Sequence, residues 1–164
     1  MSRWPRGEAE IEQLIANKQL QQVIGGQANG AHLLQKASRT LETAGEIADQ
    51  DPDSAYVLAY DAARYSGTAI LAHQGLRPMT TGGHYAVEVA LRAQFGDGFR
   101  PFGTMRRRRN ELEYPTGLGE TTTHDEAHKA IQDAKGAARG SSAVDAYPLD
   151  LLTWIESRRQ EGRG

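Results

Sequence analysis

The sequence predicts an all-α fold, an antiparallel bundle of helices with additional short helices near its two ends. Three observations indicate this class. Apolar residues recur every three or four positions over most of the chain, which is typical of helices with one buried face. Alanine supplies much of the predicted core, and alanine favours helix. Gly-Gly, Asp-Pro and Gly-Asp-Gly punctuation separates the periodic segments, and no strand of useful length is indicated.

Two helices are expected before residue 50. The apolar residues from Ile11 to Ile24 predict the first helix, and Gly25-Gly26 should end it. Leucine and alanine residues at helical spacing predict a second helix over about 28–49. We expect one domain overall, with an N-terminal helix and extension, a main bundle and a C-terminal helix with a frayed tail: 1–27, 28–139 and 140–164.

The third helix is expected to lie at the centre of the bundle. Asp51 can cap its N-terminus, and Pro52 suits its first position because no partner is needed for an N–H there. Gly75 should end it. Its inner face is made of small residues, which let neighbouring helix axes approach closely: Ala55, Ala59, Ala62, Ala63, Ser66, Gly67 and Ala69.

Four further helices should follow. The apolar residues between Val87 and Phe95 predict a short fourth helix, and a fifth over about 99–114 should stop before Pro115. Thr123 and Glu126 form a capping-box pattern for a sixth helix reaching about residue 139. Gly140-Ser141-Ser142 should loosen the chain before a final short helix with the apolar residues Leu151, Leu152, Trp154 and Ile155.

Composition narrows the function classes. The chain has no cysteine, which excludes disulfides, thiolate metal ligands and a cysteine nucleophile. The net charge of -2 does not mark an obligate nucleic-acid binder, so attraction to phosphate must be local. No apolar run approaches the roughly 20 residues of a membrane span. We therefore expect a cytoplasmic protein with no membrane association and no cofactor.

One segment of the fifth helix is unusual, because Arg106, Arg107, Arg108 and Arg109 are consecutive. Arg109 lies on or beside the predicted buried stripe of Phe99, Phe102, Met105 and Leu112. A guanidinium in that position needs a carboxylate, because an unpaired buried charge is costly. Glu113, four residues further on, is a local partner. Asp61 of the central helix is a second candidate.

Two interpretations of this segment remain open. In the first, the four arginines form a solvated, salt-bridged helix face with Glu111 and Glu113, and Arg109 is a structural ion pair. In the second, the helix binds phosphate, because the guanidinium fork matches the oxygens of that anion. Asn110 and Tyr114 are also four residues apart, with Arg107 one turn back, so one patch can present arginine, carboxamide and phenol together.

The segment Arg109-Asn110-Glu111-Leu112-Glu113-Tyr114 resembles the R-N-x-x-x-H signature of HEPN domains (higher eukaryotes and prokaryotes nucleotide-binding). Two further segments are similar to that family in helix order. They are Tyr60-Asp61-Ala62-Ala63-Arg64 on the central helix and Gly82-Gly83-His84 at the start of the next. The resemblance covers roughly residues 28–139.

The resemblance implies a helical bundle that dimerises with its signature motifs facing each other. Many members are metal-independent ribonucleases of toxin–antitoxin or defence modules, encoded beside a nucleotidyltransferase-type partner, and others are non-catalytic. Arginine binds the scissile phosphate and histidine handles protons in the nucleases. Arg109 and Asn110 match the signature, but Tyr114 stands at the histidine position. A phenol with a pKa of about 10 is a poor base at neutral pH.

Several other residues have two interpretations each. His84 is either a capping or core-edge residue or a substitute proton donor near Arg109. His124 and His128 have the spacing of metal ligands, but without an obvious third ligand we expect surface histidines and no metal. Asp61 and Arg64 either form an internal ion pair or position Arg109.

The leading functional prediction is a HEPN-like component of a toxin–antitoxin or defence-type module. It would act as a homodimer and bind RNA, a nucleotide or a nucleotidyltransferase partner through Arg106 to Tyr114. One alternative is a metal-independent ribonuclease that uses Arg109 and Asn110 with Tyr114 or His84. The other alternative is a non-catalytic helical interaction module.

Overall fold

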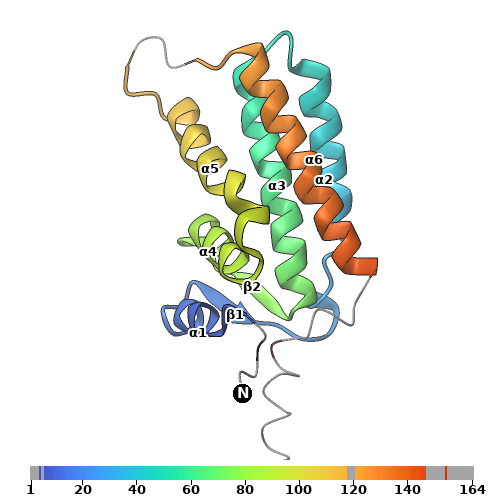
Figure 1. The fold of residues 1–164 in the computed structure, drawn as a ribbon, viewed down its shortest axis with the longest axis vertical. Helices are drawn as coiled ribbons and strands as arrows, with labels where there is room; N and C mark the ends of the chain where they lie inside the picture. Colours follow the sequence, from blue (N-terminus) through green and yellow to red (C-terminus); the bar gives the residue numbers. More distant parts are fainter. Residues whose placement is uncertain (1–3, 5, 118–120, 147–153, 155–164) are drawn as a thin grey trace, which may run out of the picture.

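The computed structural model describes residues 4, 6–117, 121–146 and 154, and it confirms the predicted all-α class. Six α-helices make up most of the described chain (Figure 1). Their bounds are α1 Glu8–Ala16, α2 Ala31–Ile47, α3 Pro52–His73, α4 Gly83–Phe95, α5 Arg100–Glu113 and α6 His124–Ala146. Two short 3₁₀ turns, η1 Gly25–Gln27 and η2 Gly96–Phe99, precede α2 and α5.

Helix α3 is the central helix, as the sequence predicted. It packs along its length against α2 and α6, and over a shorter stretch against α5 and α4 (Figure 1). All the small residues of its inner face are buried, which allows this close packing. Gly30 shows how close the approach is, because a Cβ there would lie 2.5 Å from the carbonyl oxygen of Ala69 on α3.

The predicted ends of α3 are confirmed. The Asp51 carboxylate accepts a hydrogen bond from the backbone N–H of Ser54 at 3.1 Å, and Pro52 occupies the first position. Hydrogen bonds from the Ser54 side chain and from its backbone N–H lower the pKa of Asp51 below its ordinary value. Gly75 follows the helix with a φ of 77°, a left-handed conformation that glycine adopts without strain.

The predicted first helix to Ile24 is wrong, because α1 already ends at Ala16. Lys18 has a φ of 58°, which turns the chain out of the helix. The chain then forms β1 (Leu20–Gln22), which pairs antiparallel with β2 (Leu76–Pro78), Leu20 opposite Pro78. The expectation of no useful strand is corrected accordingly. Strands of three residues are too short to reveal a two-residue period.

Helix α6 begins as predicted, with the Thr123 hydroxyl accepting from the backbone N–H of Glu126 at 3.1 Å. It does not end near 139 but continues to Ala146. A helix that packs against two neighbours can absorb the roughly 1 kcal/mol that an interior glycine costs. The predicted final helix lies outside the described residues, apart from Trp154. That side chain is buried 5.2 Å from the ring of Trp4.

Within the described ranges, no helix is long and apolar enough to cross a membrane.

Candidate functional site

Helix α5 lies against α3 with the stripe that the sequence predicted. Phe102 and Met105 are buried, and Phe99 and Leu112 are partly buried against the same core. Three of the four consecutive arginines are partly buried, and only Arg107 is exposed. The stripe therefore fixes the rotation of α5 and with it the surroundings of each arginine.

Arg108 joins α5 to α6. Its guanidinium binds both carboxylate oxygens of Glu126, at 2.7 and 3.3 Å, and Glu111 at 2.9 Å. It also donates to the carbonyl oxygen of Thr121 at 3.0 Å. Burial alone would raise the pKa of Glu126, but hydrogen bonds from Arg108 and Thr122 outweigh this and hold the pKa below its usual value. The salt-bridged interpretation therefore applies to Arg108.

Arg109 faces the inside of the site, with only 17 % of its side chain exposed. Its guanidinium binds Glu113 at 2.6 Å and the Asn110 side chain at 3.3 Å, and it lies 5.9 Å from the centre of the Tyr60 ring. The local partner predicted from the sequence is therefore confirmed. The proposed pairing of Asp61 with Arg109 is not observed, since Asp61 pairs with Arg64 at 3.6 Å.

The Nε atoms of Arg64 and Arg109 are both buried and have no hydrogen-bond partner among the described residues. Arg109 of α5 lies 5.9 Å from the centre of the Tyr60 ring, Arg64 of α3 lies 4.6 Å from the centre of the Tyr65 ring, and both charges act on His84. Each arginine therefore has only part of its donor set satisfied within the chain. Because these two Nε atoms are buried, an anionic ligand would have to contact the terminal nitrogens of the two guanidinium groups.

Arg106 is held by Glu88 of α4, with Nε 2.7 Å from the carboxylate. The side chain of Glu88 is only 7 % exposed, so its charge requires a cation nearby. Gly103 makes room for this contact, because a Cβ at that position would collide with the Glu88 carboxylate. Sequence reasoning missed Glu88. The sequence feature that could have revealed it is an acidic residue directly after Val87, on the apolar face of the predicted fourth helix.

Arg107 is exposed and has no carboxylate partner in the described part of the chain. Its nearest polar contact is the Thr104 hydroxyl at 3.5 Å. It is therefore a cation that no acidic residue in the described ranges neutralises. Tyr85 of α4 is half-exposed, and its ring centre lies 6.0 Å from the Arg106 guanidinium, so an aromatic surface adjoins the arginines.

His84 forms a pair with Tyr60 that the sequence did not predict. The Tyr60 hydroxyl lies 3.0 Å from Nδ1 of His84. Tyr60 is fully buried, and burial raises its pKa to about 12, although nearby arginines oppose the rise. His84 is half-buried, and burial lowers its pKa below the ordinary 6.5. The positive charges of Arg64 and Arg109 lower that pKa further. The imidazole is therefore neutral at pH 7.

The structure does not bring every predicted residue into this site. Tyr114 follows the last turn of α5 with 70 % of its surface exposed, and no side-chain partner is observed for it among the described residues. His128 bonds to Asp49 at 3.0 Å, which links α6 to the end of α2. The described residues include no group of three His, Cys, Asp or Glu side chains able to hold a metal ion.

We use the name α5 site for the group Arg64, His84, Arg106, Arg107 and Arg109 with the Tyr60 phenol beneath it. Its arginines outnumber the acidic residues paired with them, which are Asp61, Glu88 and Glu113. Such a surface can attract a phosphate, and the neutral imidazole can accept or relay a proton.

Comparison of the chain with protein-family models, with curated proteins and with solved structures gave no match.

Proposed function

We propose that this chain is a HEPN-like module of a toxin–antitoxin or defence-type system that binds RNA through the α5 site. The observation that supports this most is the convergence of Arg64, Arg106 and Arg109 on one histidine. Burial is the largest cause of the lowered pKa of His84, and the positive charges of these arginines lower it further. RNA is a polyanion whose phosphates take up such groups, with release of counterions. Arg108 is left out of this surface because it is saturated by Glu126 and Glu111.

The test is the binding of a labelled single-stranded RNA, measured by fluorescence anisotropy over a range of salt concentrations. The logarithm of the affinity should fall linearly with the logarithm of the salt concentration. Arg109→Ala should weaken binding and reduce the slope by about 0.7, the value for one lost phosphate contact on a single strand. Arg39→Ala on α2 is the control, because it removes the same charge from an exposed position elsewhere.

Undetectable binding, or an equal loss of affinity in Arg39→Ala and Arg109→Ala, would contradict the RNA-binding proposal. A nucleotidyltransferase-type protein is the alternative ligand of the same surface. If the chain binds such a partner but no RNA, and Arg109→Ala abolishes this binding, the result supports the partner-binding form of the proposal instead.

A second candidate function is a metal-independent ribonuclease, and the Tyr60–His84 pair favours it. With Nδ1–H donating to the Tyr60 oxygen, Nε2 of the neutral imidazole can accept the proton of a ribose 2′-hydroxyl while that oxygen attacks phosphorus. The bond from phosphorus to the 5′-oxygen then breaks, the 5′-oxygen takes up a proton from the imidazolium or from water, and a 2′,3′-cyclic phosphate is left. Arginine can stabilise the charge on the phosphate during this step. His84 suits this role better than Tyr114, because it lies among the arginines. Cleavage of transfer RNA in the presence of a chelator, lost in both His84→Gln and Arg109→Ala, would support it. Binding without cleavage would exclude this reaction for the RNA tested.

A further inference from the structure

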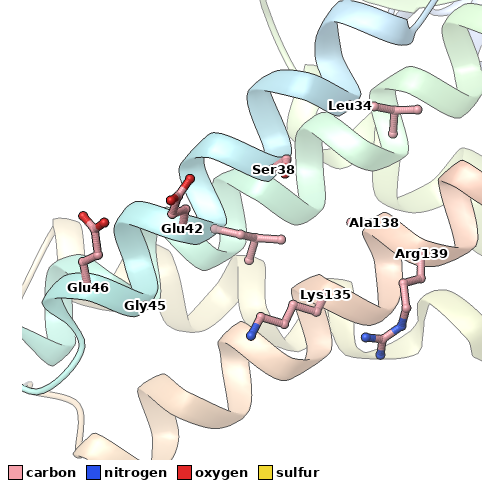
Figure 2. Close-up of a pocket in the computed structure, with 9 residues that line it drawn as sticks. Leu34, Ser38, Glu42, Gly45, Glu46, Lys135, Ala138 and Arg139 are labelled. Atoms are coloured by element: carbon pink, nitrogen blue, oxygen red, sulfur yellow. The ribbon is translucent and has the colours of Figure 1, made fainter.

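A groove on the opposite flank of the bundle, between α2 and α6, is separate from the α5 site. Its volume is about 810 Å³, and Leu34, Leu41 and Ala138 form its apolar part. Figure 2 shows that the charges along it are segregated. Glu42 and Glu46 project from α2, and Lys135 and Arg139 project from α6.

These four charges are exposed, and opposite signs line the same groove. None of them has an ion-pair partner within the described residues. Gly45 lies between the two glutamates, and a Cβ there would meet open space. A glycine inside a helix costs roughly 1 kcal/mol relative to alanine, and packing within the chain does not explain it. It leaves the α2 backbone open to close approach by another molecule.

The register of the two helices sets which charges face each other. Asp49 after α2 bonds to His128 near the start of α6, so the helices run antiparallel. Glu42 is seven residues before Asp49, and Lys135 is seven residues after His128. Because both helices rise 1.5 Å per residue, Glu42 and Lys135 lie at the same level along the groove.

We propose that a second copy of this chain binds in the α2–α6 groove and forms a symmetric dimer. A two-fold axis parallel to the helices sets α2 of each copy against α6 of its partner. Lys135 then faces the partner's Glu42, and the same contact occurs twice. A two-fold axis across the helices would set α2 against α2 and glutamate against glutamate. The charge pattern therefore favours a second copy of the chain as the ligand of the groove, and it favours the two-fold axis parallel to the helices.

The size of the face predicts a dimer of modest affinity. Over a length of about 25 Å, each of the two adjacent helices is about 10 Å wide. Together the two helices present roughly 500 Å² per copy. The total of about 1,000 Å² is at the lower limit for specific interfaces, so we expect a dissociation constant in the micromolar range. In this dimer both α5 sites face away from the interface. The HEPN resemblance implies a different dimer, with the motif helices facing each other.

The test is sedimentation equilibrium of the full chain over a range of protein and salt concentrations, with charge-reversed variants. Glu42→Lys alone and Lys135→Glu alone each place like charges in contact twice, so each should weaken self-association roughly tenfold or more. A mixture of the two variants should associate again. At positions 42 and 135 one copy then carries two lysines and the other carries two glutamates. Glu10→Lys, an exposed reversal on α1 outside the groove, is the matched control and should associate like the wild type.

Gly45→Gln gives a second test that does not depend on charge. The monomer has room for the side chain, so helix content and thermal stability should be kept while self-association is lost. A wild type that stays monomeric up to about 500 µM would overturn the proposal, since this far exceeds the expected micromolar dissociation constant. Dimers that both single reversals and Gly45→Gln leave intact would also overturn it. Dimers lost instead in Arg109→Ala would favour an interface at α5.

Discussion

Replacing Arg107 by alanine and replacing Arg108 by alanine should affect different properties of the protein, although the two residues are adjacent. Arg108 makes three hydrogen bonds that join α5 to α6 and to the segment before it, and a fourth to Glu111 within α5. Arg107 is exposed, and among the described residues its side chain has a polar contact only with the Thr104 hydroxyl, at 3.5 Å. The variants therefore separate an arginine that stabilises the bundle from one that is available to a ligand.

The size of the effect follows from the geometry. A buried charge-assisted hydrogen bond contributes about 1.5–3 kcal/mol, and an exposed ion pair contributes about 0.2–1 kcal/mol. The Arg108 side chain is 24 % exposed and Glu126 is 35 % exposed, so solvent screening reduces the upper value. We expect Arg108→Ala to lower the free energy of unfolding by about 2 kcal/mol, which lowers Tm by about 4–8 °C. Arg107→Ala should change it by less than about 0.5 kcal/mol.

Urea denaturation followed by circular dichroism measures the free energy of unfolding of both variants. The slope of this free energy against urea concentration should equal that of the wild type. RNA affinity is then measured well below the Tm of each variant, where we expect Arg107→Ala to bind more weakly and Arg108→Ala to bind normally. An equal loss of stability in the two variants would refute the proposed division of roles. So would weaker binding in Arg108→Ala alone.

Three further predictions concern stability. Gly30→Ala should destabilise the fold by about 2 kcal/mol by urea denaturation, because its Cβ would collide with the backbone of Ala69; Gly45→Ala, with open space, should not. Tyr60 ionises near pH 10 when unfolded and near 12 when folded, so stability should fall between these values, less steeply in Tyr60→Phe. The lowered pKa of His84 means that stability falls as pH drops below about 6.5, and acid titration of His84→Gln should show a smaller fall.

Local sequence patterns predicted the features that depend on residues close in sequence, namely helix bounds, helix caps and ion pairs within one helix. The apolar stripe predicted the bounds of α5 to within one residue, and the four-residue spacing predicted the Glu113 partner of Arg109. Asp51-Pro52 predicted the start of α3 for the same reason, since capping involves only adjacent residues.

Tertiary partners could not be predicted in this way. Glu88 reaches Arg106 across eighteen residues, and Glu126 reaches Arg108 across another eighteen. These contacts depend on how α4 and α6 pack beside α5, which no periodicity within one helix specifies. The early end of α1 depends on a left-handed turn at Lys18, a conformation that the residue type does not favour. The pairing of Tyr60 with His84 likewise joins two helices.

The most direct test of the α5 site is the NMR titration of the His84 imidazole with and without a short single-stranded RNA, with His84→Gln used to assign the resonance. Phosphate bound among the arginines would offset the positive charge that lowers the pKa of His84. We therefore predict that RNA raises this pKa in the wild type and leaves it unchanged in Arg109→Ala. An RNA that binds without moving the His84 titration in the wild type would contradict the proposed site.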